Sequence, residues 1–258
     1  MTTGAAKAWR VTGTVATVLV VIGAGLQTWS LVAQQESTSS RSYDVPVHRL
    51  KLQTGSASVK VRAGRADHVV VGQRLDWTVR KPVVSSVIVD GLLTVGVQCR
   101  PVLPVADFGC GAEIEVEVPA ATEVSGSVGS GAVRVEGLSG NVDVELGSGE
   151  LLLVDTSGDV TARATSGLIR GVDLSARRVD VRTTSGAMEL SFAKAPQQVE
   201  TRATSGSVTV TLPRNSRYAF SSDVGSGTGR IDPQLADSDS PNHIHATATS
   251  GSITIDPS

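Results

Sequence analysis

The chain has 258 residues, of which 40% are hydrophobic and only 3% aromatic, and its formal net charge is −2. This length allows one sizeable domain, and the composition is that of neither a disordered nor a fibrous chain. Recognition of nucleic acid would require a clustered basic excess, so the charge balance gives no reason to expect a nucleic-acid partner. The scarcity of aromatic rings favours a narrow interior filled by Val, Leu, Ile and Ala.

The first predicted element is a membrane-spanning helix at residues 11–33, VTGTVATVLVVIGAGLQTWSLVA, which carries no charge. About 20 apolar residues cross a bilayer as a helix. Lys7 and Arg10 precede this segment, so we expect residues 1–10 in the cytoplasm and the remainder of the chain outside. The alternative is a cleaved signal peptide ending at Ala33, and both interpretations export the domain. Residues 34–44 are polar and Ser-rich, which predicts a flexible spacer.

The chain contains two cysteines, Cys99 and Cys110, which enclose the segment RPVLPVADFG. In an exported chain, two cysteines this close most simply form one disulfide. Closing a loop of this size contributes on the order of 2–3 kcal/mol by restricting the unfolded chain. A metal pair or a reactive thiol is the alternative, but neither a C-x-x-C spacing nor a partner histidine supports it.

The dipeptide Ser-Gly recurs at seven points of one repeated pattern, at spacings near 20 residues. Self-similarity at this period is typical of a solenoid, in which each repeat buries its apolar edge only against its neighbours. Glycine at a corner permits a positive φ without a Cβ clash, and serine can bond nearby backbone. The glycines that we expect to form structural turns are Gly131, Gly149, Gly167, Gly186, Gly206, Gly227 and Gly251.

Apolar residues keep a fixed register around these glycines. The residue seven positions before the glycine is apolar in every repeat, and those three before, two after and four after are mostly apolar. This alternation at period two predicts two half-buried strands that meet at each Ser-Gly corner. Gly55 marks an earlier coil of the same kind. We therefore predict an all-β, single-domain β-solenoid over residues 45–256, with about seven to nine coils. The less regular residues 62–118 would form its capping end.

Four segments carry a resemblance to a known family: TSGLIRGV (165–172), TSGAMEL (184–190), TSGSVTVTLP (204–213) and TSGSITI (249–255). Such units behind a single N-terminal membrane helix resemble the adhesin-like β-strand-repeat family of bacteria, whose function is unknown. Related toastrack-like domains are associated with envelope-stress and cell-surface signalling proteins. The resemblance implies the fold over roughly residues 45–256, and it implies neither a catalytic residue nor a cofactor.

Catalytic and metal-binding interpretations find little support in the sequence. Catalysis needs one serine with a base and an oxyanion donor, whereas seven equivalent serines serve turns. The motif G-x-S-x-G is absent, and the four histidines match no triad motif. His243 and His245 flank Ile244 and would project outward together, but no third metal ligand is predictable. We expect no catalytic residue, no metal site and no cofactor.

Arginine occupies the fourth position before the glycine in three consecutive repeats, at Arg163, Arg182 and Arg202. If the coils stack in parallel register, these residues form a ladder with rungs about 4.8 Å apart. Three guanidiniums in a line could bind a polyanion such as a wall phosphate polymer. The alternative is that Asp180–Arg182 and Glu200–Arg202 neutralise one another as ordinary surface pairs.

The function that the sequence favours is that of a non-enzymatic, membrane-anchored protein of the cell surface, facing outside, which acts in adhesion, scaffolding or envelope-associated binding. Its expected partners are the membrane, through the N-terminal helix, and a cell-wall polymer or an envelope protein. Two alternatives remain open: a sensory or accessory ectodomain of an envelope-stress signalling system, and a polysaccharide-active β-helix enzyme. The enzyme would require converging carboxylates in a groove.

Overall fold

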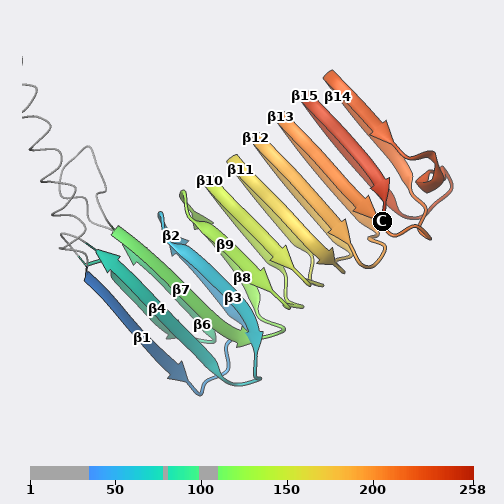
Figure 1. The fold of residues 1–258 in the computed structure, drawn as a ribbon. Coiled ribbons are helices and arrows are strands. Elements are labelled where there is room, and N and C mark those ends of the chain that lie inside the picture. Colours follow the sequence, from blue (N-terminus) through green and yellow to red (C-terminus); the bar gives the residue numbers. More distant parts are fainter. Residues whose placement is uncertain (1–34, 78–80, 99–109) are drawn as a thin grey trace, which may run out of the picture.

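The computed structural model describes residues 35–77, 81–98 and 110–258 (Figure 1). The predicted membrane helix at residues 11–33 and Cys99 lie outside the described residues, so the anchor and the Cys99–Cys110 disulfide stay predictions. The described chain forms fifteen strands and one short 3-10 helix, η1 (Pro233–Leu235). The prediction of an all-β, solenoid-like fold is confirmed.

Parallel strands in matching register form the repeated part of the domain. Each Ser-Gly corner lies beside the corner of the neighbouring strand, as in the pairs Gly149–Gly167 and Gly186–Gly206. The strands are β8 (Glu123–Val128), β9 (Ala132–Glu136), β10 (Val142–Val154), β11 (Val160–Leu174), β12 (Arg178–Phe192), β13 (Gln198–Leu212), β14 (Ala219–Ile231) and β15 (His243–Pro257).

Each long strand folds back on itself at its Ser-Gly corner. Only residues 175–177 connect β11 to β12, although the two strands pair from one end to the other. A straight strand of this length would measure about 50 Å, which three residues cannot span in return. The two halves of each strand therefore lie in two layers, and the short connections form the edge opposite the corners.

The core lies between these two layers. The side chains that alternate inward before and after each corner belong to one buried hydrophobic cluster. In β13, for example, Val199, Ala203, Val208 and Val210 are all buried. The predicted apolar register is thus confirmed. The side chains at the outward positions of both layers face solvent, where they can contact a ligand.

The less regular residues form one end of the same sheet, where the order of the strands in space differs from their order in the sequence. The coil around Gly55, formed by β2 (Arg49–Thr54) and β3 (Ser58–Gly64), lies between the β8–β9 coil and a coil of β6 (Leu92–Gln98) and β7 (Cys110–Pro119). Beyond this last coil the direction reverses, since β5 (Val83–Val89) pairs antiparallel with β6, and β4 (Val69–Trp77) pairs antiparallel with β7.

The prediction of a flexible spacer at residues 34–44 is wrong for most of that segment. Residues Gln35–Tyr43 form β1, which pairs antiparallel with β4 along its whole length and begins the sheet. The segment is polar because it is an edge strand whose residues are mostly exposed, with Tyr43 packed against the core. Serine and threonine are well suited to such an edge, so a Ser-rich composition alone could not distinguish strand from linker.

The last two strands are exchanged relative to their order in the sequence. β15 pairs with β13 on one side and with β14 on the other, so β14 ends the sheet (Figure 1). The inward positions of β15 carry apolar residues throughout, whereas those of β14 include Ser222 and Gly229. The interior place therefore goes to the strand with more apolar surface to bury.

The corner glycines are required for a reason beyond backbone conformation. A positive φ occurs at Gly167, Gly186, Gly206, Gly227 and Gly251, but not at the other two corners. At all seven, an added Cβ would fall well inside van der Waals contact of a backbone carbonyl in the neighbouring coil. The close approach of successive corners therefore selects glycine at these seven positions.

Candidate functional site

The register of the strands places the predicted arginine ladder on the outer face of the first layer. Glu145, Arg163, Arg182, Arg202 and Thr247 lie side by side on β10, β11, β12, β13 and β15. The three arginines are thus on consecutive strands, as the repeat predicted. We call this row the arginine column.

Acidic side chains two residues upstream pair with the arginine column. Arg182 binds both carboxylate oxygens of Asp180, at 2.9 and 2.8 Å, and lies 3.7 Å from Glu200, which also binds Arg202. The bond to Asp180 raises the pKa of Arg182 above its ordinary value. The expectation of neutralising surface pairs is therefore confirmed for these two residues.

Among the three arginines of the column, Arg163 has the longest ion-pair distances. Thr161 occupies the position on β11 where β12 and β13 carry an acid. The nearest carboxylates, those of Asp143 and Glu145 on β10, lie 3.7 and 3.6 Å from the guanidinium, beyond good hydrogen-bonding distance. Because these groups are half exposed, such pairs contribute only about 0–1 kcal/mol each and can exchange partners readily.

A threonine column borders the arginines on the side of the corners. Thr165, Thr184, Thr204 and Thr249 are exposed and follow one another on β11, β12, β13 and β15. Together the two columns line a groove of about 680 Å³ that runs across the strands. A chain molecule lying in it would meet a guanidinium and a hydroxyl on each of three successive strands. Sequence reasoning found the arginines but missed the threonines, although the repeated T-S-G motif carried that signal.

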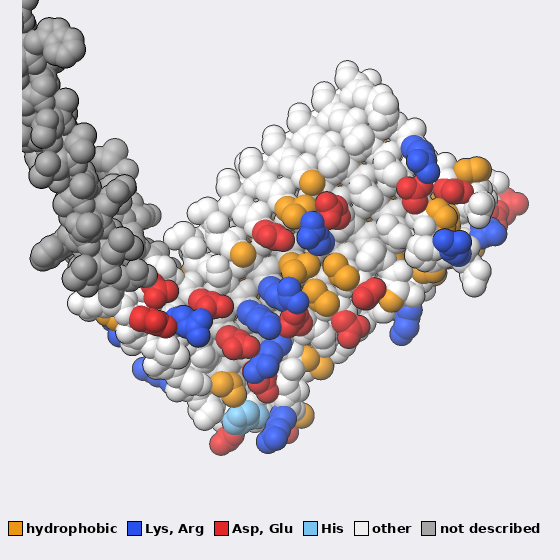
Figure 2. All heavy atoms as spheres, in the orientation of Figure 1, with side chains coloured by type: hydrophobic (Ala, Val, Ile, Leu, Met, Phe, Trp, Pro, Cys, Tyr) orange, Lys and Arg blue, Asp and Glu red, His pale blue; other side chains and the backbone are white. Residues whose placement is uncertain are grey.

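The corner ridge beside this groove consists of small uncharged residues. Each corner contributes an exposed serine next to its glycine, such as Ser166, Ser185 and Ser205. Figure 2 shows the result as a band along one long edge, from which charged and hydrophobic side chains are missing. On the visible face, many charged side chains lie away from this band over the strands toward the β1 end, and a further group lies at the opposite end of the sheet.

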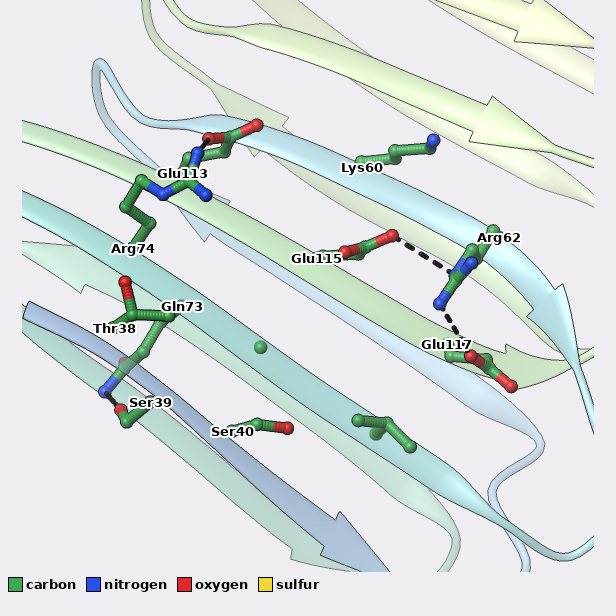
Figure 3. Close-up of a pocket in the computed structure, with 12 residues that line it drawn as sticks. Thr38, Ser39, Ser40, Lys60, Arg62, Gln73, Arg74, Glu113, Glu115 and Glu117 are labelled. Atoms are coloured by element: carbon green, nitrogen blue, oxygen red, sulfur yellow. Dashed lines mark hydrogen bonds and ion pairs between the residues drawn. The ribbon is translucent and has the colours of Figure 1, made fainter.

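A second hollow, of about 490 Å³, lies on the second layer over β1, β4, β7 and β3 (Figure 3). Gly72 leaves space opposite Glu115. The side chains around it are joined by ion pairs, since Arg62 lies 3.2 Å from Glu115 and 3.0 Å from Glu117, and Arg74 lies 3.3 Å from Glu113. Its carboxylates are therefore held by arginines, which is unlike the unpaired acid and base that glycoside hydrolysis requires.

The side chains of His243 and His245 point outward, as the sequence predicted. Ile244 is buried between the outward-facing His243 and His245. Within residues 35–77, 81–98 and 110–258, no group of three or more His, Cys, Asp or Glu side chains is arranged to hold a metal ion. In the same ranges, no helix is both long and apolar enough to cross a membrane.

Residues 121–257 match the family model described as Toastrack DUF4097, and they make up more than half of the chain. The chain belongs to the Toastrack DUF4097 family. This confirms the resemblance that the repeated T-S-G segments carry. Among curated proteins, none is similar to this toastrack protein in sequence.

Two solved structures are similar to this chain. A candidate adhesin from Bacteroides fragilis is 11% identical, with a TM-score of 0.52 over 86% of this chain and 97% of that chain. A candidate adhesin from Parabacteroides distasonis is 12% identical, with a TM-score of 0.49 over 86% of this chain and 97% of that one. At this identity the first likeness shows the toastrack fold alone.

Proposed function

We propose that this toastrack protein is a non-enzymatic, membrane-anchored protein of the cell surface that holds an extended anionic polymer of the envelope in the groove between its arginine and threonine columns. The observation that carries the proposal is repetition. Arg163, Arg182 and Arg202 present the same group at the same height on three consecutive strands. A polymer with regularly spaced anionic groups can meet such a row several times.

The chemistry of the groove suits phosphate or carboxylate groups. A guanidinium presents a planar set of donors that matches either anion in a bidentate manner. The threonine hydroxyls can donate to the remaining anionic oxygens or bond to hydroxyl groups of a sugar polymer. Because the arginines are half exposed, an arriving anion exchanges one weak ion pair for another and needs no desolvation of a buried charge.

The acidic residues beside the arginine column weaken each single contact with such a polymer. Asp180 and Glu200 compete with the polymer for Arg182 and Arg202, so each single contact is weak. Tight binding then requires several contacts at once, since linking weak contacts raises the effective local concentration of the next one. A long polymer should therefore bind much more tightly than a short fragment with the same anionic groups.

Membrane attachment and exposure to the outside rest on the sequence of residues 1–33, namely an uncharged apolar run preceded by Lys7 and Arg10. The absence of catalysis is part of the proposal and is supported by the ion-paired carboxylates of the hollow over β1, β4, β7 and β3. Binding along a repeated face is also consistent with the adhesin description of the related structures.

The test measures binding of the full chain, purified in a mild detergent, to long-chain polyphosphate, with uncharged dextran as the comparison polymer. The variant Arg163→Ala/Arg182→Ala/Arg202→Ala should lose polyphosphate binding. The matched control Arg62→Ala/Arg134→Ala/Arg170→Ala removes three exposed, ion-paired arginines from the opposite layer and should bind as the wild type does.

A second variant distinguishes a polyanion-binding site from ordinary surface ion pairs. Asp180→Asn/Glu200→Gln removes the competing acids and should strengthen polyphosphate binding, with a steeper dependence on salt concentration. Equal loss of binding in the two arginine triples would contradict the proposal, because it would show a response to net charge alone. Unchanged binding in the Asp180/Glu200 variant would contradict it too.

A further inference from the structure

The strand that ends the sheet, β14, presents an open edge over most of its length. Within residues 35–77, 81–98 and 110–258, β14 pairs only with β15. The 232–242 connection bonds Tyr218, which directly precedes β14 and bridges to Ala236. Its bond from the Ala219 N–H to the Asn242 carbonyl continues the pairing with β15 and leaves the other side of β14 open. The outer N–H and C=O groups of residues 219–231 thus face away from the sheet. Such an edge can add a further strand.

The charges of β14 are self-complementary. Asp223 is the only acidic residue of the strand and lies before the corner, while Arg230 is the only basic residue and lies after it. Both are exposed. No ion pair within 4 Å involves Asp223 in the described part of the chain, and the guanidinium of Arg230, although 3.2 Å from Asp256, is 72% exposed. Both groups are therefore open to a second molecule.

Geometry selects one way of pairing two copies of this strand. A two-fold axis that runs along the strands, between the two layers, makes the two β14 strands antiparallel. When this axis passes between Ser226 and Gly227, the corner of one copy lies against the corner of the other. The first half of one β14 then faces the second half of the other. Val224 lies opposite the partner's Gly229, and both are inward positions because they flank the buried Ala248 and Ile253 of β15.

The same axis places Asp223 opposite the partner's Arg230. By symmetry, Arg230 also lies opposite the partner's Asp223, so one contact gives two ion pairs. A shift of the register by one residue would turn inward side chains outward. The register that keeps both layers continuous across the axis is therefore the one that pairs the charges.

We propose that β14 is a homophilic adhesion edge: two copies of this chain join end to end through antiparallel pairing of their β14 strands. The strand order places β1 at one end of the sheet and β14 at the other (Figure 1). Between them lie ten strand spacings, or about 50 Å. Two joined copies would thus hold their β1 strands about 100 Å apart. If residues 11–33 anchor the chain, as the proposed function assumes, the two anchors belong to opposing membranes.

The experiment uses the full chain in detergent, one copy per micelle, in two preparations that carry different fluorescent labels. Mixing wild-type preparations should give energy transfer that rises with concentration. Asp223→Arg should weaken the association at least about tenfold, since it sets two like-charged pairs against each other. Arg230→Asp should weaken it to the same extent, and the matched control Asp239→Arg, in the adjacent connection, should leave it unchanged.

The decisive measurement mixes the two weakened variants. Asp223→Arg in one preparation and Arg230→Asp in the other restore opposite charges at both contacts, so their mixture should recover association that neither variant shows alone. Thermal unfolding confirms that each variant is folded. A wild type that stays monomeric, an Asp223→Arg variant that associates normally, or a mixture without recovery would each overturn the proposal. Polyphosphate binding is measured on different residues, so either proposal can fail while the other stands.

Discussion

Replacing the corner glycine Gly206 by alanine should break the stack between β12 and β13. Gly206 has a φ of 154°, a conformation that side chains rarely adopt. Its added Cβ would also overlap the backbone carbonyl of Gly186 in the neighbouring strand. A flexible side chain could move away from such an overlap, but a backbone carbonyl within a paired strand cannot.

The expected cost has two parts. Holding a non-glycine residue in a sparsely populated conformation costs on the order of 1–3 kcal/mol. Separating the two corners enough to admit a methyl group also weakens ladder hydrogen bonds, each with a net contribution of about 1 kcal/mol. We therefore expect Gly206→Ala to lower the free energy of unfolding by about 3–5 kcal/mol.

Gly55→Ala provides the control. Gly55 lies beside the corner of its coil, two residues before Ala57, which stands opposite the corner glycine Gly131. A Cβ on Gly55 would meet no atom within 4 Å, so its substitution should change stability by less than about 0.5 kcal/mol. Urea unfolding, followed by circular dichroism, measures both values. Hydrogen exchange should locate the damage of Gly206→Ala at the β12–β13 boundary, since each repeat contacts only its neighbours. Equal stability of the two variants would refute the close-approach explanation of the corner glycines.

Two further substitutions test the interior and the surface network. Thr201 is completely buried in β13, and its hydroxyl has no hydrogen-bond partner among the described residues. The nearly isosteric Thr201→Val should therefore raise the free energy of unfolding by about 1 kcal/mol, measured by urea unfolding. A loss of stability would show that the hydroxyl is hydrogen-bonded. Burial acts to raise the pKa of Glu136, but bonds and charges from Arg134 and Lys60 outweigh it and lower that pKa. A lowered pKa stabilises the fold above the ordinary carboxyl range, and this stabilisation disappears as pH falls through the folded-state pKa. Glu136→Gln should therefore unfold more easily than the wild type at pH 7 and equally easily in strong acid, and a difference that persists in acid would contradict the assignment.

The repeated part of the domain was predictable in detail because one rule fixes it. A parallel, in-register stack places residues of equal offset side by side, so the offsets of Arg163, Arg182 and Arg202 from their glycines predicted the arginine column. The same rule predicted the buried positions. The groove itself was not predictable in this way, since its second wall depends on the threonines of the repeated T-S-G segments, for which the sequence suggests only a family resemblance.

The two ends of the stack could not be derived from the period. Several parallel neighbours in the same register are equally compatible with one repeat, so the period leaves open where the Gly55 coil lies and in which order β14 and β15 pair. The deciding quantity is apolar area, and Ser222 and Gly229 at inward positions of β14 are the signal that places this strand at the edge. Strand β1 was not predicted, because a polar edge strand and a polar linker have the same composition.

The unequal ends of the stack give the toastrack domain a direction. At the β1 end, the two layers finish in separate antiparallel strands, β1 and β5, that no Ser-Gly corner connects. At the other end, β14 passes through its corner as one bent strand and so presents the edges of both layers in a fixed relation. A two-fold axis through the corner can therefore continue both layers at the β14 end only. A polymer in the groove makes the same contact on several strands, so its contacts add to one another. Pairing through β14 can occur only once per molecule, and it is selective for another copy of this chain.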